Sequence, residues 1–363
     1  MLELGVFMPV GNNGWIISKS SPQYMPTYDL NRRITQLAEE VGFDYIFSMC
    51  KWRGFGGATG FWNYTVESMM LTAGLAPYTC RAGLIASIAP AIIHPAVFAK
   101  MAATLDDICQ GRLMLNIVSA ANRAEYSQMG LYPAHFETYR YEYTEEWLHV
   151  VKRLWTEEHV THHGQYFHLD DCMSLPHPVQ QPFPSIVCAT SSERGYRFVA
   201  EHCNYAFITG NSVEETKAAS LKAKALGEEV GRPVRTQANV ILILGETEDA
   251  ARAMYQDYVV GADRDAIDNV FHLRARDRTA ERVANMKDRY ESEDRIIYGG
   301  LTCVGGPEHT AEFFEDLAVN GAVDGIVMAF QDFLVGLRTF GDKVMPLLRR
   351  RGIEVGLPES GMR

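Results

Sequence analysis

The stretch FSMCKWRGFGG, residues 47–57, places two cations directly after an apolar run. Lys51 and Arg53 follow Phe47 and Met49, whose side chains share one side of an extended chain because strand side chains alternate. A cation beside apolar walls suits an anionic or carbonyl-bearing ligand. Solvated loop charges are the equal alternative, and the glycines that follow fit either a close approach to a ligand or a tight turn.

Ser87 and Asn116 are polar residues inside strongly apolar segments, 82–89 and 113–119. A buried asparagine must find hydrogen-bond partners, and a bound ring with donors and acceptors would provide them. The alternative is a core asparagine that a neighbouring backbone satisfies. We favour a ligand role for Asn116, and both interpretations stay open for Ser87.

Three further segments have the pattern of helix starts that can bind phosphate. YRYEY (139–143) contains Arg140 and Tyr141, TSSERG (190–195) contains Ser192, and VGGPEH (304–309) contains Pro307. Serines there could cap the helix, bind phosphate or do both. Aromatic packing explains the first segment equally well.

The sequence contains no evident nucleophile or metal motif. It has neither GxSxG nor HExxH, and the histidine pairs in THH and PHP lack a third ligand. An enzyme without an acid, base or metal set commonly takes its chemistry from an organic cofactor. We therefore expect a cofactor and no metal.

The elements that must position these residues alternate between apolar runs and amphipathic helical stretches. This pattern, with eight candidate strands, predicts a (βα)8 TIM barrel in which the strand C-terminal ends form the active face. A two-domain dinucleotide-binding protein is the competitor, but no glycine motif has the required context. We expect one domain, 1–363, with insertions at about 155–183 and 262–298. The candidate strands are 2–10, 45–49, 82–89, 113–119, 185–189, 205–209, 238–244 and 325–330.

Composition limits the partners. The formal net charge of -11, without a polybasic block, argues against nucleic acid and anionic membranes. No apolar run reaches the roughly 18 residues of a membrane span. The seven scattered cysteines predict reduced, buried thiols in a cytoplasmic protein.

The run HPAVFAKMAATLDDICQGRLMLNIVS, residues 94–119, resembles the bacterial-luciferase-like flavin monooxygenases, a (βα)8 barrel family. Its closest similarity is to members that open pyrimidine rings, because GVFMPVGNNGWIIS, SMCKWRGFGG, FWNYTVES, EYSQMG and FLVGLRTFGDKVMPL resemble their segments in order. This resemblance implies FMN reduced by a separate NAD(P)H flavin reductase, and O2 reacting at flavin N5. The resulting peroxide would cleave a ring amide of uracil or thymine to a ureidoacrylate peracid. A homo-oligomer, dimer or tetramer, is also implied.

The resemblance also assigns roles to residues. FMN would be held by Cys50 and Lys51 through their backbone and by Asn116, Glu125, Arg140, Tyr141 and Ser192. Phe47, Met49, Ser87 and Ile117 would line the pocket where O2 and substrate meet the flavin. Asn116, Ser87 and Lys51 would be the catalytic residues.

Several positions depart from the pyrimidine-opening pattern. Ala120 and Ala121 stand where relatives have glycine and tryptophan, Phe47 replaces a smaller aliphatic residue, and Ser87 replaces threonine. These changes reshape the pocket, and pocket shape discriminates by only about 1–3 kcal/mol per methylene. Another small N-heterocycle or an organosulfur compound is the alternative substrate. A flavin-binding relative without activity and a deazaflavin-dependent dehydrogenase are the remaining alternatives.

Overall fold

Eight apolar segments form a closed ring of parallel strands in the computed structural model. The model describes residues 1–119, 123–275 and 295–356. Helices cover the outside of the ring, so the strands are buried on both faces and their sequences are continuously apolar. In ring order the strands are β1 (Glu3–Phe7), β2 (Tyr45–Ser48), β3 (Gly83–Ile88), β4 (Leu113–Ile117), β7 (Ser185–Ala189), β8 (Tyr205–Ile208), β9 (Arg235–Leu244) and β11 (Gly325–Phe330).

Closure of the ring confirms the predicted (βα)8 barrel and excludes the open dinucleotide-binding alternative. β11 pairs with β1, and β8 pairs with β9, so no barrel strand is left at an edge. The eight barrel strands correspond to the eight predicted segments. The register places Ser87 beside Asn116 and Phe7 beside Phe47.

The ends of the connecting helices carry residues that favour helix termini. Thr27 caps α1 by accepting a hydrogen bond from the Leu30 backbone, and α1 ends at Gly42, whose φ of 102° is left-handed. Pro307 occupies the first turn of α11 as predicted. The helices are α1 (Tyr28–Val41), α2 (Ser68–Leu75), α3 (Pro95–Ile108), α4 (Arg123–Ser127), α5 (Phe136–Thr156), α6 (Glu193–His202), α7 (Val213–Glu229), α8 (Glu248–Val260), α9 (Arg264–Ala275), α11 (Pro307–Ala318), α12 (Phe333–Thr339) and α13 (Met345–Arg350).

Three described strands lie outside the ring and were not predicted. The insertion at 155–183 contains an antiparallel hairpin of β5 (Val160–His163) and β6 (His168–Cys172), whose sequences are too polar to resemble core strands. β10 (Leu301–Gly305) pairs with the second half of β9, outside the ring. The insertion at 262–298 begins with α9, and residues 276–294 of it lie outside the described part of the chain.

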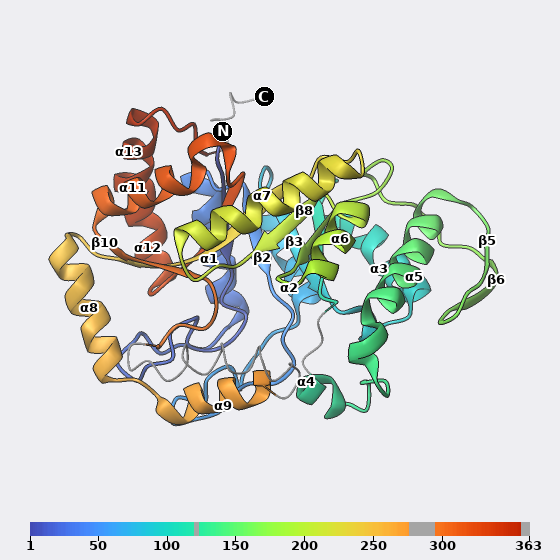
Figure 1. Ribbon diagram of the computed structural model, residues 1–363, viewed down its shortest axis with the longest axis horizontal. Coiled ribbons are helices and arrows are strands. Elements are labelled where there is room, and N and C mark those ends of the chain that lie inside the picture. Colours follow the sequence, from blue (N-terminus) through green and yellow to red (C-terminus); the bar gives the residue numbers. More distant parts are fainter. Residues whose placement is uncertain (120–122, 276–294, 357–363) are drawn as a thin grey trace.

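Aromatic side chains fill the part of the barrel near the C-terminal ends of its strands. The Phe47 ring lies 4.9 Å from the Phe7 ring and 4.8 Å from the Phe207 ring. Trp15, in the loop after β1, stacks on Phe7 at 4.3 Å. The barrel is therefore packed up to its C-terminal end, where α4 and α9 lie, opposite the N-terminus (Figure 1).

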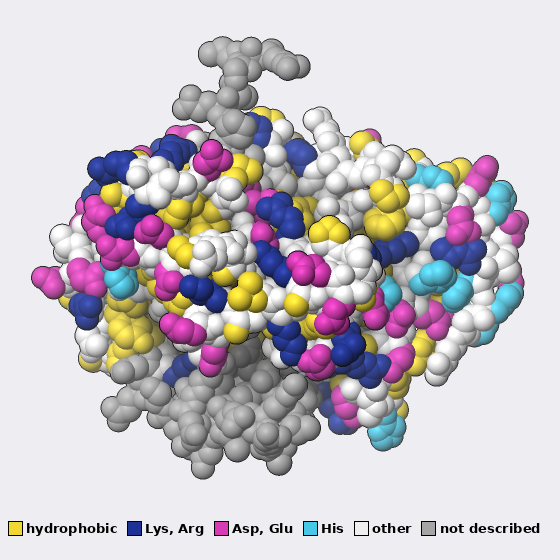
Figure 2. All heavy atoms as spheres, turned by 45° about the horizontal axis from the view of Figure 1, so that its top comes forward, with side chains coloured by type: hydrophobic (Ala, Val, Ile, Leu, Met, Phe, Trp, Pro, Cys, Tyr) yellow, Lys and Arg dark blue, Asp and Glu magenta, His cyan; other side chains and the backbone are white. Residues whose placement is uncertain are grey.

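The surface carries charges of both signs, and Figure 2 shows them interspersed over one face. In the described residues, no helix has the length and apolar character needed to cross a bilayer. All seven cysteines are free thiols, but Cys80 is exposed, so the prediction of buried thiols is wrong there. Cys80 follows the short helical turn after α2, where the chain runs over the surface.

Candidate active site

Lys51 and Glu125 form a buried ion pair at the C-terminal end of the barrel. Lys51 Nζ lies 2.8 Å from Glu125 Oε2, and each side chain is only 6% exposed. Lys51 belongs to the loop after β2, and Glu125 belongs to α4 after β4. Lys51 is therefore no solvated loop charge, whereas Arg53 is exposed, as that alternative predicted.

Glu125 holds the β2 loop at two points. Its second oxygen, Oε1, accepts a short hydrogen bond from the Trp52 backbone N–H. The Lys51 ammonium also sits 4.5 Å from the centre of the Phe55 ring, a favourable cation–π contact. Removing two charges from water is costly, and their close pairing offsets part of that cost. A carboxylate can accept further bonds, so Glu125 keeps capacity for a ligand hydroxyl.

Cys50 lies in the same loop but is not poised as a nucleophile. Its sulfur accepts a hydrogen bond from the Trp52 indole N–H at 3.0 Å. Burial, together with the nearby Glu125 carboxylate, raises the pKa of the Cys50 thiol to about 12. The thiol is thus neutral near pH 7, and only the thiolate attacks.

Ser87 and Asn116 belong to one hydrogen-bond network between β2, β3, β4 and α2. Asn116 Nδ2 donates to Ser87 Oγ at 2.9 Å, and Ser87 Oγ donates to the Ser48 carbonyl at 2.7 Å. Ser68 Oγ accepts from the Ser87 backbone N–H at 2.8 Å and donates to the same Ser48 carbonyl at 2.8 Å. Asn116 Oδ1 is buried and has no partner in the described structure.

Arg140, Tyr141 and Ser192 come together from two helices, α5 and α6. The Tyr141 and Ser192 hydroxyls are 3.0 Å apart, and the Arg140 guanidinium lies 5.0 Å from the centre of the Tyr141 ring. Ser192 caps α6 by accepting from the Gly195 N–H at 3.1 Å. The predicted start of α6 is therefore real and lies beside the Tyr141 hydroxyl, whereas residues 139–143 follow the start of α5 at Phe136 by about one turn.

This second cluster has unfilled hydrogen-bonding capacity. Arg140 Nε and Thr190 Oγ1 are buried without a partner in the described structure. A Cβ at Gly195 would lie 1.8 Å from Thr190 Oγ1 and 2.7 Å from the Tyr141 hydroxyl, so no larger residue fits there. Donors, a helix N-terminus and a residue without a side chain together suit a phosphate group.

The residues predicted to line the substrate pocket differ in their burial and in the strand face that they occupy. Phe47 is fully buried in the aromatic packing of the barrel, and Met49 is partly buried. Ile117 directly follows Asn116 in β4, so their side chains point to opposite faces of the strand. Ala120 and Ala121 lie outside the described residues.

The RGFGG loop packs against the start of α9. Asp263 Oδ2 accepts from the Thr59 backbone N–H and hydroxyl, both at 2.7 Å. Gly57 has a φ of +75°, and a Cβ there would lie 2.6 Å from the Ala266 Cβ. Burial alone would raise the pKa of Asp263, but hydrogen bonds from Thr59 and Ala266 hold that pKa below its ordinary value. These glycines therefore serve close packing between two segments.

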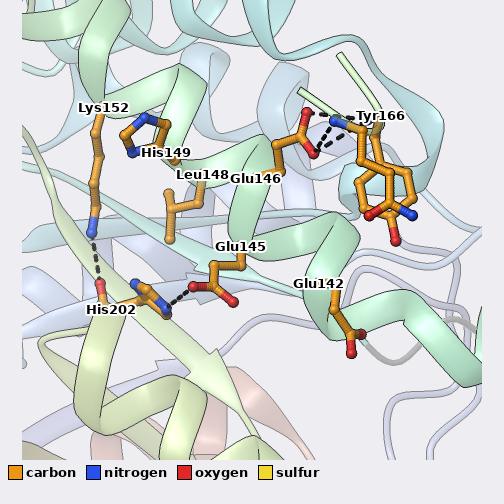
Figure 3. Close-up of a pocket in the computed structure, with 9 residues that line it drawn as sticks. Glu142, Glu145, Glu146, Leu148, His149, Lys152, Tyr166 and His202 are labelled. Atoms are coloured by element: carbon orange, nitrogen blue, oxygen red, sulfur yellow. Dashed lines mark hydrogen bonds and ion pairs between the residues drawn. The ribbon is translucent and has the colours of Figure 1, made fainter. Parts of the chain in front are cut away.

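A surface cavity of about 340 Å³ lies elsewhere, between α5, α6 and the hairpin turn (Figure 3). Glu146 accepts backbone hydrogen bonds from the turn residues 165–167, and Lys152 Nζ donates to the His202 carbonyl at 2.9 Å. Burial lowers the pKa of His202 to about 4, so this imidazole is neutral near pH 7. These contacts hold the hairpin and α6 onto α5. The cavity residues are Glu142, Glu145, Glu146, Leu148, His149, Lys152, Gln165, Tyr166 and His202.

Comparison with known proteins decides the family. Residues 2–324 match the sequence profile of luciferase-like monooxygenases. The chain belongs to this family. Family membership confirms the family resemblance and the enzyme class predicted from the sequence, and it agrees with the observed barrel fold.

Two curated relatives of this luciferase-like monooxygenase cover almost its whole length. Pyrimidine monooxygenase RutA of Cronobacter turicensis is 38% identical over 97% of this chain and 93% of its own. Pyrimidine monooxygenase RutA of Caulobacter segnis is 39% identical over 96% of this chain and 100% of its own.

Solved structures of lower identity share the fold. Riboflavin lyase RcaE, solved with modified FMN and riboflavin, superposes with a TM-score of 0.86 at 19% identity, covering 99% of this chain and 94% of that one. The long-chain alkane monooxygenase LadA gives 0.81 at 18% identity, covering 100% and 93%. At these identities only the architecture is comparable.

Several site residues were missed by the sequence reasoning. Ser48 contributes only its backbone carbonyl, which any residue type could supply. Ser68 is the first residue of α2, and a serine is common at that position, so neither residue stands out in the sequence. Thr190 and Gly195 were inside the TSSERG segment but were not singled out. In the described residues, no three metal-binding side chains converge on one point.

Proposed function

We propose that this enzyme is a two-component, FMN-dependent monooxygenase that opens the amide ring bond of a pyrimidine such as uracil or thymine. The observation that carries the proposal is the 38–39% identity to pyrimidine monooxygenases over nearly the whole of both chains. The site supports it, because unfilled polar atoms and a buried cation gather at the barrel end where such enzymes act.

The residues present fit FMN. The cluster of Arg140, Tyr141 and Ser192 with the small Gly195 suits the phosphate, and Thr190 adds an unpaired hydroxyl. The backbone of Cys50 and Lys51, together with Asn116 and Glu125, would hold the rest of the cofactor. When bound in its reduced form, FMN would supply the electrons that activate O2.

The chain's own groups would then orient the substrate and exclude water. The Lys51 ammonium, fixed by Glu125, can stabilise negative charge that develops on an attacked carbonyl oxygen. The buried Phe47 and partly buried Met49 would keep that region dry. A protein nucleophile is not required, which agrees with the neutral thiol of Cys50.

Incubation of the protein with FMN, a flavin reductase, NADH, O2 and uracil tests the proposal. We expect uracil to disappear and a ring-opened acid to accumulate, with no product when FMN is omitted. Intact uracil despite continued NADH consumption would rule out the pyrimidine assignment.

A different small N-heterocycle or an organosulfur substrate is the second candidate. Structures that share this barrel carry names as diverse as long-chain alkane monooxygenase and EDTA monooxygenase, the latter with a TM-score of 0.83. A substrate panel read by mass spectrometry separates the candidates. The same assay with thymine tests how much space the buried Phe47 leaves.

We propose further that the chain is one barrel domain that assembles into a dimer or tetramer in the cytoplasm and receives reduced FMN from a partner reductase. Among the described residues, the buried hydrophobic side chains form one large cluster and a small one around Ala89, Tyr126 and Phe136. A single cooperative unfolding transition would support one domain. Light scattering measures the assembly, and fractionation of cells gives the location.

A further inference from the structure

Ser87 has no hydrogen-bonding hydrogen left for a ligand. Its backbone N–H donates to Ser68 Oγ and its hydroxyl hydrogen is directed to the Ser48 carbonyl. The residue is 0% exposed. A serine hydroxyl has one hydrogen, so Ser87 Oγ can only accept from its remaining neighbour.

That neighbour is Asn116, and the restriction fixes which way its carboxamide points. If the amide were flipped, Oδ1 would face a Ser87 oxygen that has no hydrogen to offer, and two acceptors would be in contact. Asn116 must therefore present Nδ2 to Ser87, at 2.9 Å. Its oxygen then faces away from Ser87.

The freed atom is buried and unpaired. Asn116 is 4% exposed, and Oδ1 has no partner within the described structure. A buried acceptor without a partner is costly, and it recovers that cost when a donor arrives. The network thus prepares an acceptor at the barrel end that also holds the Lys51–Glu125 pair.

We infer that Ser87 is a positioning residue whose hydrogen bond turns Asn116 Oδ1 toward the ligand, so that the site selects a heterocycle with an N–H donor. The inference rests on the proposed function for the identity of the heterocycle. Two sources share this chemistry: N5–H of reduced flavin, which oxidised flavin lacks, and a ring N–H of a lactam substrate.

The decisive variant is Ser87→Ala, because it removes the constraint and lets the Asn116 amide turn. Ser87→Thr keeps the hydroxyl, so it should keep the Asn116 amide in place and retain the wild-type ratio of reduced to oxidised FMN binding, although its added methyl group changes the pocket. The matched control is Thr72→Val on the same helix as Ser68, because the Thr72 hydroxyl donates to the Ser68 backbone oxygen at 2.8 Å and does not enter the network. If Ser87→Ala does not fold, Ser87→Cys replaces the hydroxyl with a weakly bonding thiol of similar size.

Anaerobic titrations with oxidised and reduced FMN, followed by flavin absorbance, test the flavin source. We expect Ser87→Ala to narrow the preference for reduced over oxidised FMN by about 3- to 10-fold, the scale of one hydrogen bond. A tenfold change equals roughly 30 mV in the two-electron potential of the bound flavin. Thr72→Val should leave the ratio unchanged.

Binding of uracil and of its N-methylated derivatives to the FMN-loaded protein tests the substrate source. If Asn116 Oδ1 accepts a hydrogen bond from the substrate N–H, Ser87→Ala should reduce the preference for uracil over its N-methylated derivatives by a similar factor. The ratio of reduced to oxidised FMN binding should then stay at the wild-type value. Both ratios equal to wild type in folded Ser87→Ala would overturn this inference alone. Failure of wild-type protein to bind FMN in either state would overturn the proposed cofactor as well.

Discussion

Two polar groups, one at each end of the barrel, differ in how far their hydrogen bonds are completed within the protein. At the N-terminal end, Glu3 Oε1 pairs with Arg235 at 2.6 Å, and the same guanidinium nitrogen donates to the Tyr205 hydroxyl at 3.1 Å. The Tyr205 and Tyr45 hydroxyls are 3.2 Å apart. One oxygen of Glu3 and both polar side-chain atoms of the neighbouring, buried Gln237 lack a partner in the described residues, but the Glu3–Arg235–Tyr205–Tyr45 chain itself is joined by bonds within the protein.

At the C-terminal end, two chains of hydrogen bonds end at buried polar atoms that have no partner in the described residues. The serine network ends at Asn116 Oδ1, and the α5–α6 cluster ends at Arg140 Nε and Thr190 Oγ1, all without partners in the described residues. A fully bonded group stabilises the fold, whereas unfilled acceptors and donors are useful only when a ligand completes them. The contrast separates residues that hold the barrel from residues that serve its ligand.

Asn116→Ala should have the largest effect on this contrast. We expect turnover to fall by about 10²–10³-fold or more, the range for losing one preorganised polar group in an active site, while the fold stays intact. Substrate loss and thermal unfolding are measured side by side. Asn204→Ala is the control, because Asn204 is exposed and bonds the Ile186 backbone. Wild-type rates in Asn116→Ala would show that the assigned role is misplaced.

Lys51→Met should lower both stability and turnover, because it breaks a buried ion pair inside the candidate active site. The free energy of unfolding should fall by about 3 kcal/mol, because Glu125 remains buried without its counter-charge. In the double variant Lys51→Met with Glu125→Gln, most of that stability should return but not the turnover. Unfolding in denaturant measures the free energy of unfolding, and uracil loss measures turnover. A single variant as stable as wild type would mean that the pair does not form in solution.

Glu3→Ala should lower stability alone. It leaves the partly exposed Arg235 without its carboxylate, which we expect to reduce the free energy of unfolding by about 1–3 kcal/mol. Turnover per folded molecule should stay at the wild-type value. A large loss of turnover would contradict the division between the two ends.

Asp44→Asn should have the smallest effect, visible only as a pH dependence. Burial raises the pKa of Asp44 to about 6, although its carboxylate accepts a hydrogen bond from the Leu4 backbone. The folded state then binds more protons than the unfolded state between about pH 4 and 6, so this residue makes stability fall as pH rises through that window. The variant should lose that slope. An unchanged slope in urea unfolding from pH 4 to 7 would assign it to another group.

The sequence was sufficient for the barrel because its strands, buried on both faces, are continuous apolar runs. The β5–β6 hairpin was missed because VTHH and HLDDC are largely exposed and carry no such signal. Asn116 and Ser87 could be singled out as polar residues in apolar strands. Their partners could not, since a backbone carbonyl of Ser48 has no sequence signature, and Glu125 was found only through the family resemblance.

The contact between Gly57 and α9 has a consequence for how this enzyme can change. Any side chain at position 57 would collide with the Cβ of Ala266, so the β2 loop and the start of α9 must be inherited as a matched set. A chimera that keeps its own α9 but takes residues 45–66 from a family member with any residue other than glycine at position 57 would start from a mismatch. Recombination of barrel modules should therefore succeed most often when both segments come from the same parent.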